Sequence, residues 1–159
     1  MSYLTNSIKN VKVKTGSSVS ALNIDTNLAA ITGTDIAYTP DNDADYVVYE
    51  AQIYFYWDGG GQVVPHQDFI SLRLQEDSTG SFADITGTTF NAYSIYYSDS
   101  IETIKIIIPA WSGKRTLRLA GRAHTSNYNM KFHQTMVVDG TADAEIVYPQ
   151  VIVYSVRNE

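Results

Sequence analysis

The sequence predicts an all-β domain, an antiparallel jelly-roll sandwich of about eight to ten strands. The stretch from Asp45 to Trp57 alternates with period two over its whole length, as a half-buried strand does. Several shorter alternating stretches follow, separated by turn residues at intervals of about 8 to 12 residues. No segment shows a convincing helical period, which also favours an all-β fold.

The stretch from Asp45 to Trp57 is the expected central strand. One face is apolar throughout and belongs in a core: Val47, Tyr49, Ala51, Ile53, Phe55 and Trp57. The other face is polar but rich in phenol rings: Tyr46, Val48, Glu50, Gln52, Tyr54 and Tyr56. β-Branched and aromatic residues favour a strand over a helix here, and the glycines at 59–61 end it.

Two weaker strands are expected before the central strand. Residues 19–24 alternate weakly, and residues 36–40 form a short strand that proline stops, because proline has no N–H to donate. Residues 27–31 are compatible with one helical turn. Residues 1–18 end in Thr15-Gly16-Ser17-Ser18, so we expect an N-terminal arm at 1–18 and the sandwich at 19–159.

After the central strand, alternation returns at once. Residues 69–75 place Ile70, Leu72 and Leu74 on one face, with polar residues between them. Further strands are expected at 82–85, 88–97 and 101–108, separated by Gly87 and by Ser98-Asp99-Ser100. Residues 115–124 alternate again, with Arg118, Arg122 and His124 on the polar face, and residues 136–138 form a short strand.

The last expected strand, residues 145–156, is apolar on both faces. Val147, Val151 and Val153 share one face, and the other carries Ile146, Tyr148, Ile152, Tyr154 and Val156. A strand that is apolar on both faces must be covered on both. One cover is the core of the sandwich, so the other is a loop or another subunit.

The net charge of −6 is unevenly distributed. The first acidic residue is Asp25, and Lys9, Lys12 and Lys14 precede it, so residues 1–18 carry +3 and the remainder −9. We interpret these lysines as part of an attachment arm, or alternatively as a solvated terminus. The acidic body argues against a nucleic-acid partner.

Other absences narrow the functional classes. There is no cysteine, so disulfides and thiolate sites are excluded. No apolar run approaches 18 residues and the first residues lack a hydrophobic signal core. We therefore expect that the protein is assembled in a cytoplasm and does not associate with a membrane. There is no Gly-x-Ser-x-Gly nucleophile elbow and no phosphate-binding glycine loop. We therefore expect that the protein is not an enzyme and that it binds no cofactor.

Two motifs leave open the possibility that the chain binds a metal ion. Asp41, Asp43 and Asp45 alternate as calcium ligands do, but Tyr46 and Gln52 rule out an EF-hand, and a solvated acidic turn is the simpler interpretation. His66 and Asp68, followed by His124, resemble the Fe(II) ligand set of the 2-oxoglutarate oxygenases. Gln134 stands where those enzymes have an arginine, so three unrelated histidines are the alternative.

The polar face with Arg118, Arg122 and His124 could bind an acidic group, such as a carbohydrate or phosphate, or pair with acidic residues of the same or a neighbouring chain. Trp57, Trp111 and exposed tyrosines could stack on sugars. A carbohydrate- or receptor-binding sandwich, with a host-surface glycan as partner, is therefore an alternative function.

The order of segments is similar to that of a known group of proteins. The Tyr38-Thr39-Pro40 strand, residues 81–90, Trp111-Ser112-Gly113 and the closing residues 148–154 resemble the jelly-roll heads of phage head fibres, spikes and decoration proteins, and distantly C1q/TNF-like domains. The resemblance implies a non-enzymatic virion protein, assembled in the host cytoplasm, that binds a capsid or tail protein. It also implies a homotrimer whose interface residues are Tyr46, Tyr54, Tyr56, Ile152, Tyr154 and Val156.

Overall fold

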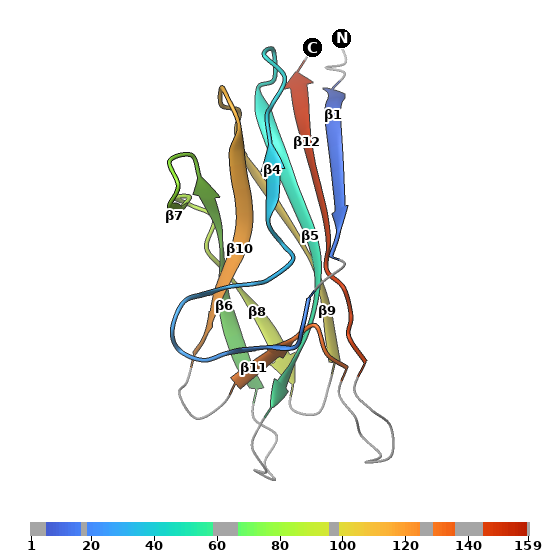
Figure 1. The fold of residues 1–159 in the computed structure, drawn as a ribbon, viewed down its shortest axis with the longest axis vertical. Coiled ribbons are helices and arrows are strands. Elements are labelled where there is room, and N and C mark those ends of the chain that lie inside the picture. The colour runs from blue at the N-terminus through green and yellow to red at the C-terminus, as the bar shows by residue number, and fades with distance from the viewer. Residues whose placement is uncertain are drawn as a thin grey trace, which may run out of the picture.

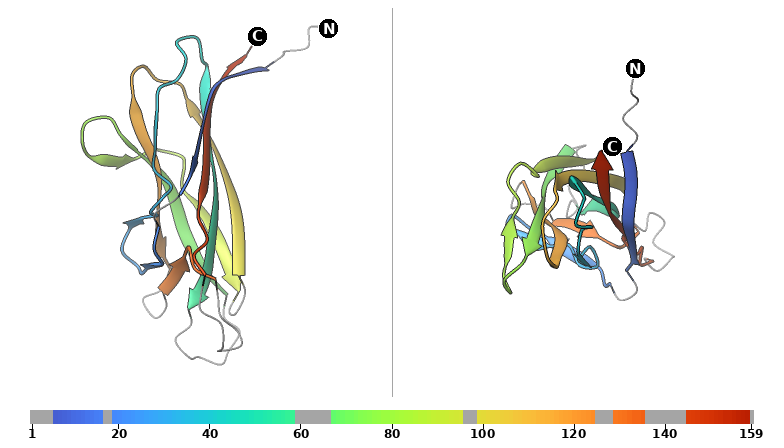
Figure 2. Two further views of the ribbon diagram at one scale, coloured as in Figure 1. Left: turned by 45° about the vertical axis from the view of Figure 1, so that its right-hand side comes forward. Right: turned by 90° about the horizontal axis from the view of Figure 1, so that it is seen from above.

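The computed structural model describes residues 6–16, 19–58, 67–95, 99–124, 129–135 and 145–158. It confirms the all-β prediction: two antiparallel sheets pack face to face as a sandwich (Figures 1 and 2). The strands of the described residues are β1 Asn6–Thr15, β2 Leu22–Ile24, β3 Ala29–Ala30, β4 Ile36–Tyr38, β5 Tyr46–Asp58, β6 Gln67–Asp77, β7 Phe82–Asp84, β8 Phe90–Ile95, β9 Asp99–Pro109, β10 Arg115–Ala123, β11 Asn129–Phe132 and β12 Gln150–Asn158.

The strand order within the sheets is that of a jelly roll. One sheet, here called the β5 sheet, has the order β1-β12-β5-β9, with β11 and then β2 on the β12 side of β5. The other, the β10 sheet, has the order β4-β10-β6-β8, with β3 beside β10 and β7 beside β6. Strands from the two ends of the chain therefore lie side by side, as two interlocked Greek keys require.

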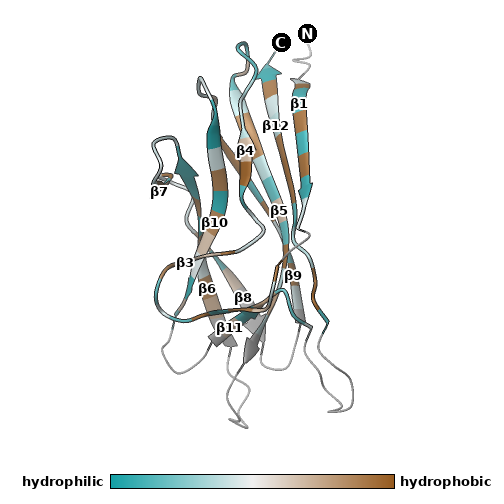
Figure 3. Ribbon diagram, in the orientation of Figure 1, coloured by the Kyte–Doolittle hydropathy of each residue, from teal (hydrophilic) through white to brown (hydrophobic). Residues whose placement is uncertain are grey.

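The central strand is where the sequence places it. β5 pairs with β9 from Tyr46 to Tyr56 and with β12 from Tyr46 to Gln52. Its predicted core face is buried wherever it is described, with Val47, Tyr49, Ala51, Ile53 and Phe55 at most 1 % exposed. They pack against the inner face of the β10 sheet, where Leu72, Leu74, Leu117 and Leu119 are fully buried. Alternating hydrophilic and hydrophobic bands along these strands are visible in Figure 3.

The N-terminal segment differs from the expectation of an arm outside the sandwich. Residues 6–15 form β1, which pairs with β12 from Asn6 opposite Asn158 to Thr15 opposite Gln150 (Figure 1). A bulge at Asn10, whose φ is +46°, interrupts the pairing between Lys9 and Lys12. The lysines at 12 and 14 suggest a charged tail when only the sequence is considered. In the structure they lie on one side of β1, which is the edge strand of the β5 sheet.

Other local expectations also change. The segment expected to contain one helical turn holds the short strand β3 instead. The strand β11 was not expected, and the strand predicted at 136–138 lies outside the described residues. β12 begins at Gln150, because Pro149 precedes it and residues 145–149 make only the single bridge Gln134–Ile146.

Candidate functional site

The outer face of the β5 sheet, which points away from the sandwich core, is the first candidate surface. Residues directly opposite one another in an antiparallel pair share a face. Ile8 is opposite Val156, and Val13 is opposite Ile152. Tyr154 is opposite Val48, which in turn is opposite Ile107. These pairings form one surface across β1, β12, β5 and β9.

Large apolar side chains on this face are exposed to solvent. Ile8 is 60 % exposed, Val13 62 %, Ile101 64 % and Ile107 61 %. Val11, beside the bulge of β1, is 57 % exposed. Several exposed apolar side chains on one sheet face are typical of a surface that binds another molecule.

The predicted interface residues only partly belong to this exposed surface. Tyr46, Ile152 and Tyr154 are half-buried on the outer face. Tyr54 and Tyr56 are each 6 % exposed and Val156 is 4 % exposed, so the single chain already buries them. The prediction that these last three provide the contact area is therefore wrong. The exposed positions are instead in β1, read from the sequence as an arm, and in β9.

The middle of this face is covered within the chain. Tyr154 of β12 and Lys105 of β9 belong to the strands on either side of β5, and interaction with the Tyr154 hydroxyl, ahead of the Glu50 carboxylate, raises the pKa of Lys105. Val48 of β5, which is opposite Tyr154, is only 2 % exposed. The exposed apolar residues therefore lie on both flanks of a covered centre.

The lysines assigned to the arm lie at the edge of the sandwich. Lys12 Nζ donates to the carbonyl of Ala37 at 2.7 Å, and Lys14 Nζ donates to that of Asp35 at 2.8 Å. Lys14 also forms an ion pair of 2.9 Å with the Asp35 carboxylate. Asn10 Nδ2 donates to the carbonyl of Thr39 at 2.6 Å. These β1 side chains cap the carbonyls of residues 35, 37 and 39, which lie in and beside β4. Lys9 is exposed to solvent.

The outer face of the β10 sheet carries the predicted polar residues. Arg118 Nε donates to Gln75 Oε1 at 3.0 Å, and its guanidinium lies 3.5 Å from the ring centre of Phe82. Gln75 and Arg73 both bond to Asp84, which lowers the pKa of that carboxyl. Arg118 is thus held by its own chain, but by a glutamine and an aromatic ring and not by the acidic residue expected from the sequence.

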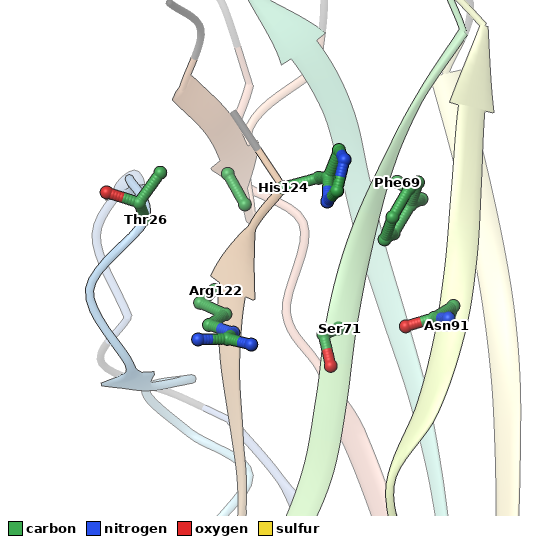
Figure 4. Close-up of a pocket in the computed structure, with 7 residues that line it drawn as sticks. Thr26, Phe69, Ser71, Asn91, Arg122 and His124 are labelled. Atoms are coloured by element: carbon green, nitrogen blue, oxygen red, sulfur yellow. The ribbon is translucent and has the colours of Figure 1, made fainter. Parts of the chain in front are cut away.

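Arg122 and His124 lie apart from that network, in a groove of about 370 Å³ at the other end of the sheet. Figure 4 shows its lining: Thr26, Phe69, Ser71, Asn91, Arg122, Ala123 and His124. The backbone N–H of His124 donates to the carbonyl of Phe69, and the two rings stack with centres 4.1 Å apart. The N–H of Ala123 donates to the carbonyl of Asp25, which places Thr26 beside the groove.

The acidic turn is occupied by contacts within the chain. The Asp43 carboxylate forms an ion pair of 2.8 Å with Arg157. The Asp45 carboxylate accepts the backbone N–H of Asn158 at 2.7 Å. The carboxylates of Asp43 and Asp45 are thus both directed at β12. In the part of the chain that is described, no group of three acidic or histidine residues is suited to hold a metal ion.

The proposed iron ligands cannot be assembled from the described side chains. His66 and the side chain of Asp68 lie outside them, and His124 is stacked on Phe69. His133, the third histidine of the chain, is fully buried with φ +63°, and its burial lowers its pKa to about 4 against an opposing effect of the Thr32 backbone. The two tryptophans do not form a sugar platform among described side chains: Trp111 packs on Tyr38 and Arg115, and the Trp57 side chain is outside them.

Comparison with known proteins adds no assignment: neither a protein-family model nor a curated protein matches this chain. Among the described residues there is no helix long and apolar enough to cross a membrane.

Sequence reasoning missed the β1 apolar residues and the groove for different reasons. Val11 and Val13 alternate as in a strand, but Ile8 is out of step with them because of the bulge at Asn10, and the interleaved lysines favour the interpretation as a charged tail. The groove is lined by residues from four separate segments, among them Thr26, Ser71, Asn91 and Arg122, so no local sequence pattern predicts it.

Proposed function

We propose that this chain is a non-enzymatic structural protein that acts by protein–protein adhesion through the outer face of the β5 sheet. The observation that supports the proposal is the set of exposed side chains Ile8, Val11, Val13, Ile101 and Ile107 on a rigid sheet. Covering one such side chain contributes about 1.5–3 kcal/mol. Covering all five would offset part or all of the entropy lost on association.

The partner that fits this face first is another copy of the same chain. The apolar residues lie on both flanks, in β1 and β9, which are opposite edges of one sheet. A copy rotated about a threefold axis can bring the β1 flank of one subunit to the β9 flank of the next, and such a ring closes after three copies. A homotrimer is therefore the proposed state.

In the form that the sequence resemblance suggests, the trimer is a capsid decoration, head-fibre or spike protein of a phage-like virion, bound to a capsid or tail protein. The fold is compatible with this role but does not by itself establish it. Because β1 belongs to the sheet, residues 6–15 are not a free docking peptide. Attachment through the N-terminal segment is then limited to the exposed Lys9 and to residues before β1.

The test is the native mass by sedimentation equilibrium. A trimer has a mass of 3 × 17.7 = 53 kDa. Ile107→Lys places a charge in the proposed contact and should shift the mass toward that of one chain. Thr86→Lys, which adds the same charge on an exposed turn outside this face, is the matched control and should remain trimeric. A wild-type mass of 17.7 kDa at micromolar concentration would refute self-association.

Particle binding needs a separate experiment, because a trimer could serve other functions. The purified chain is mixed with virions stripped of accessory proteins, and bound chain is measured after sedimentation. Wild-type binding that saturates, with loss in Ile107→Lys but not in Thr86→Lys, would support the virion role. A stable trimer that binds no particle would leave adhesion intact and remove the virion assignment.

A further inference from the structure

The groove on the outer face of the β10 sheet contains a row of polar side chains that crosses three strands. Arg122 of β10 is directly opposite Ser71 of β6, and Ser71 is directly opposite Asn91 of β8. All three line the groove. Adjacent strands are about 4.8 Å apart, so the row spans about 10 Å, the width of a hexose ring with its substituents.

Arg122 carries the positive charge of this groove. The other arginines are committed within the chain: Arg73, Arg115 and Arg157 form ion pairs, and Arg118 bonds to Gln75. Arg122 is exposed and has no carboxylate partner among the described residues. A guanidinium presents forked N–H donors that match the two oxygens of a carboxylate.

The next contact in the groove is a ring. The imidazole of His124 is exposed and stacks on Phe69, which supports it from one side (Figure 4). Arg122 and Thr26 lie on the opposite side of His124 in this view. A supported flat ring beside hydroxyl and amide groups is suited to a ligand with one apolar face and several hydroxyls.

We propose that this groove binds an acidic sugar, a uronic acid unit of a glycan. The carboxylate pairs with Arg122, and the ring hydroxyls bond to Ser71 and Asn91. The sugar therefore lies along this row, and its C–H groups contact the edge of the stacked His124 and Phe69 rings. Thr26 supplies a further hydroxyl at the rim. The single unpaired guanidinium favours a monoanion over a phosphate, which is usually held by several cationic or backbone donors.

The Asp25 carboxylate precedes Thr26 in the chain, and its two oxygens are occupied within its own turn. They accept from the backbone N–H of Asn27 at 2.7 Å and from the Asn27 side chain at 3.3 Å. The groove is on the β10 sheet, opposite the face proposed for self-association, so a trimer would leave it open.

The experiment is a titration of the isotope-labelled full chain followed by amide chemical shifts, with glucuronic acid as the probe. Glucose carries a neutral CH2OH group in place of the carboxylate, and acetate supplies the carboxylate without the ring. We expect shifts at His124 and Ser71, with a Kd in the range of about 1 mM. Glucose and acetate should each bind at least tenfold more weakly.

Variants tie the binding to named side chains. Arg122→Gln should weaken glucuronic acid at least tenfold, whereas Lys114→Gln, which removes one charge from an exposed turn elsewhere, should not change it. His124→Ala should weaken it several-fold. The proposal is overturned by acetate binding as tightly as glucuronic acid, by tighter binding of glucose 6-phosphate, or by no shifts at about 20 mM.

Discussion

The hydroxyl of Tyr38 lies 2.6 Å from Oγ of Ser155, so one hydrogen bond joins β4 of the β10 sheet to β12 of the β5 sheet. The same hydroxyl donates to the carbonyl of Asn10 at 2.7 Å, at the bulge of β1. Ser155 Oγ also accepts the N–H of Asp41 at 3.2 Å. This one buried cluster therefore fixes β1, β4 and β12 relative to each other.

Tyr38→Phe should lower the free energy of unfolding by about 1–3 kcal/mol, because it leaves the Asn10 carbonyl and the Ser155 hydroxyl without their partner. Urea unfolding followed by fluorescence measures it. Tyr148→Phe, at a side chain that is 47 % exposed, should change stability by less than about 0.5 kcal/mol. Combining Tyr38→Phe with Ser155→Ala should cost less than the sum of the two single changes, and strict additivity would contradict the cluster.

Deleting residues 1–15 should destabilise the domain by at least about 5 kcal/mol, a large share of the stability of an ordinary domain. The deletion removes β1, exposes the edge of β12 and uncaps the carbonyls of Asp35, Ala37 and Thr39. Thermal unfolding by circular dichroism measures the loss. If residues 1–15 were instead a free arm, the deletion would leave the Tm unchanged. That outcome would contradict the role of β1 in holding the domain together.

Stability should fall as the pH is lowered from about 6.5 to about 4, because His133 is buried without a counter-ion among the described residues. Its folded pKa of about 4 is below the ordinary 6.5, so the unfolded chain binds its proton first. The full loss from this group is about 3 kcal/mol. The pKa of Asp84 is also lowered, but the loss of stability from its protonation falls mainly below pH 3.8.

The measurement is urea unfolding at several pH values in His133→Asn. Asparagine does not titrate and tolerates the positive φ of this position. The variant should lose most of the pH dependence between 6.5 and 4, whereas His124→Asn, at an exposed ring, should keep it. Equal slopes in all three proteins would show that His133 is not the titrating group.

Gly33→Ala should destabilise by about 3 kcal/mol, from the left-handed backbone and from overpacking. The φ of Gly33 is +78°, and an added Cβ would lie 2.5 Å from Val19 Cγ1 and 2.8 Å from Pro149 Cγ. Gly80→Ala is the control, since φ is +96° but nothing lies within 4 Å of the new Cβ. It should cost only about 1 kcal/mol, the backbone part alone. The difference between the two midpoints in urea isolates the clash.

The sequence predicts the fold class and β5 well, because strict alternation over 13 residues has one simple interpretation. Alternation also reports which residues of β5 face the core. It does not report what covers the opposite face. Tyr54 and Tyr56 were therefore expected at a subunit contact, and they are buried within one chain.

The errors at β1 and in the groove have a shared cause. Whether Lys12 and Lys14 are free or capping carbonyls of β4 depends on a strand more than 20 residues away. Arg122, Ser71 and Asn91 likewise form a row only after β10, β6 and β8 pair. Pairing between distant strands carries this information, and residue types alone do not.

The place of β12 between β1 and β5 determines when the β5 sheet can be completed. Ile8 is paired with Val156, so every residue up to 156 must be synthesised before β1 can gain its neighbour. Until then the carbonyls at residues 35, 37 and 39 and the apolar side of β1 have only water or chaperones to contact. Such long-range closure makes folding slow. Each molecule therefore passes through an interval, before β12 pairs, in which the surfaces of β1 are open to the wrong partners.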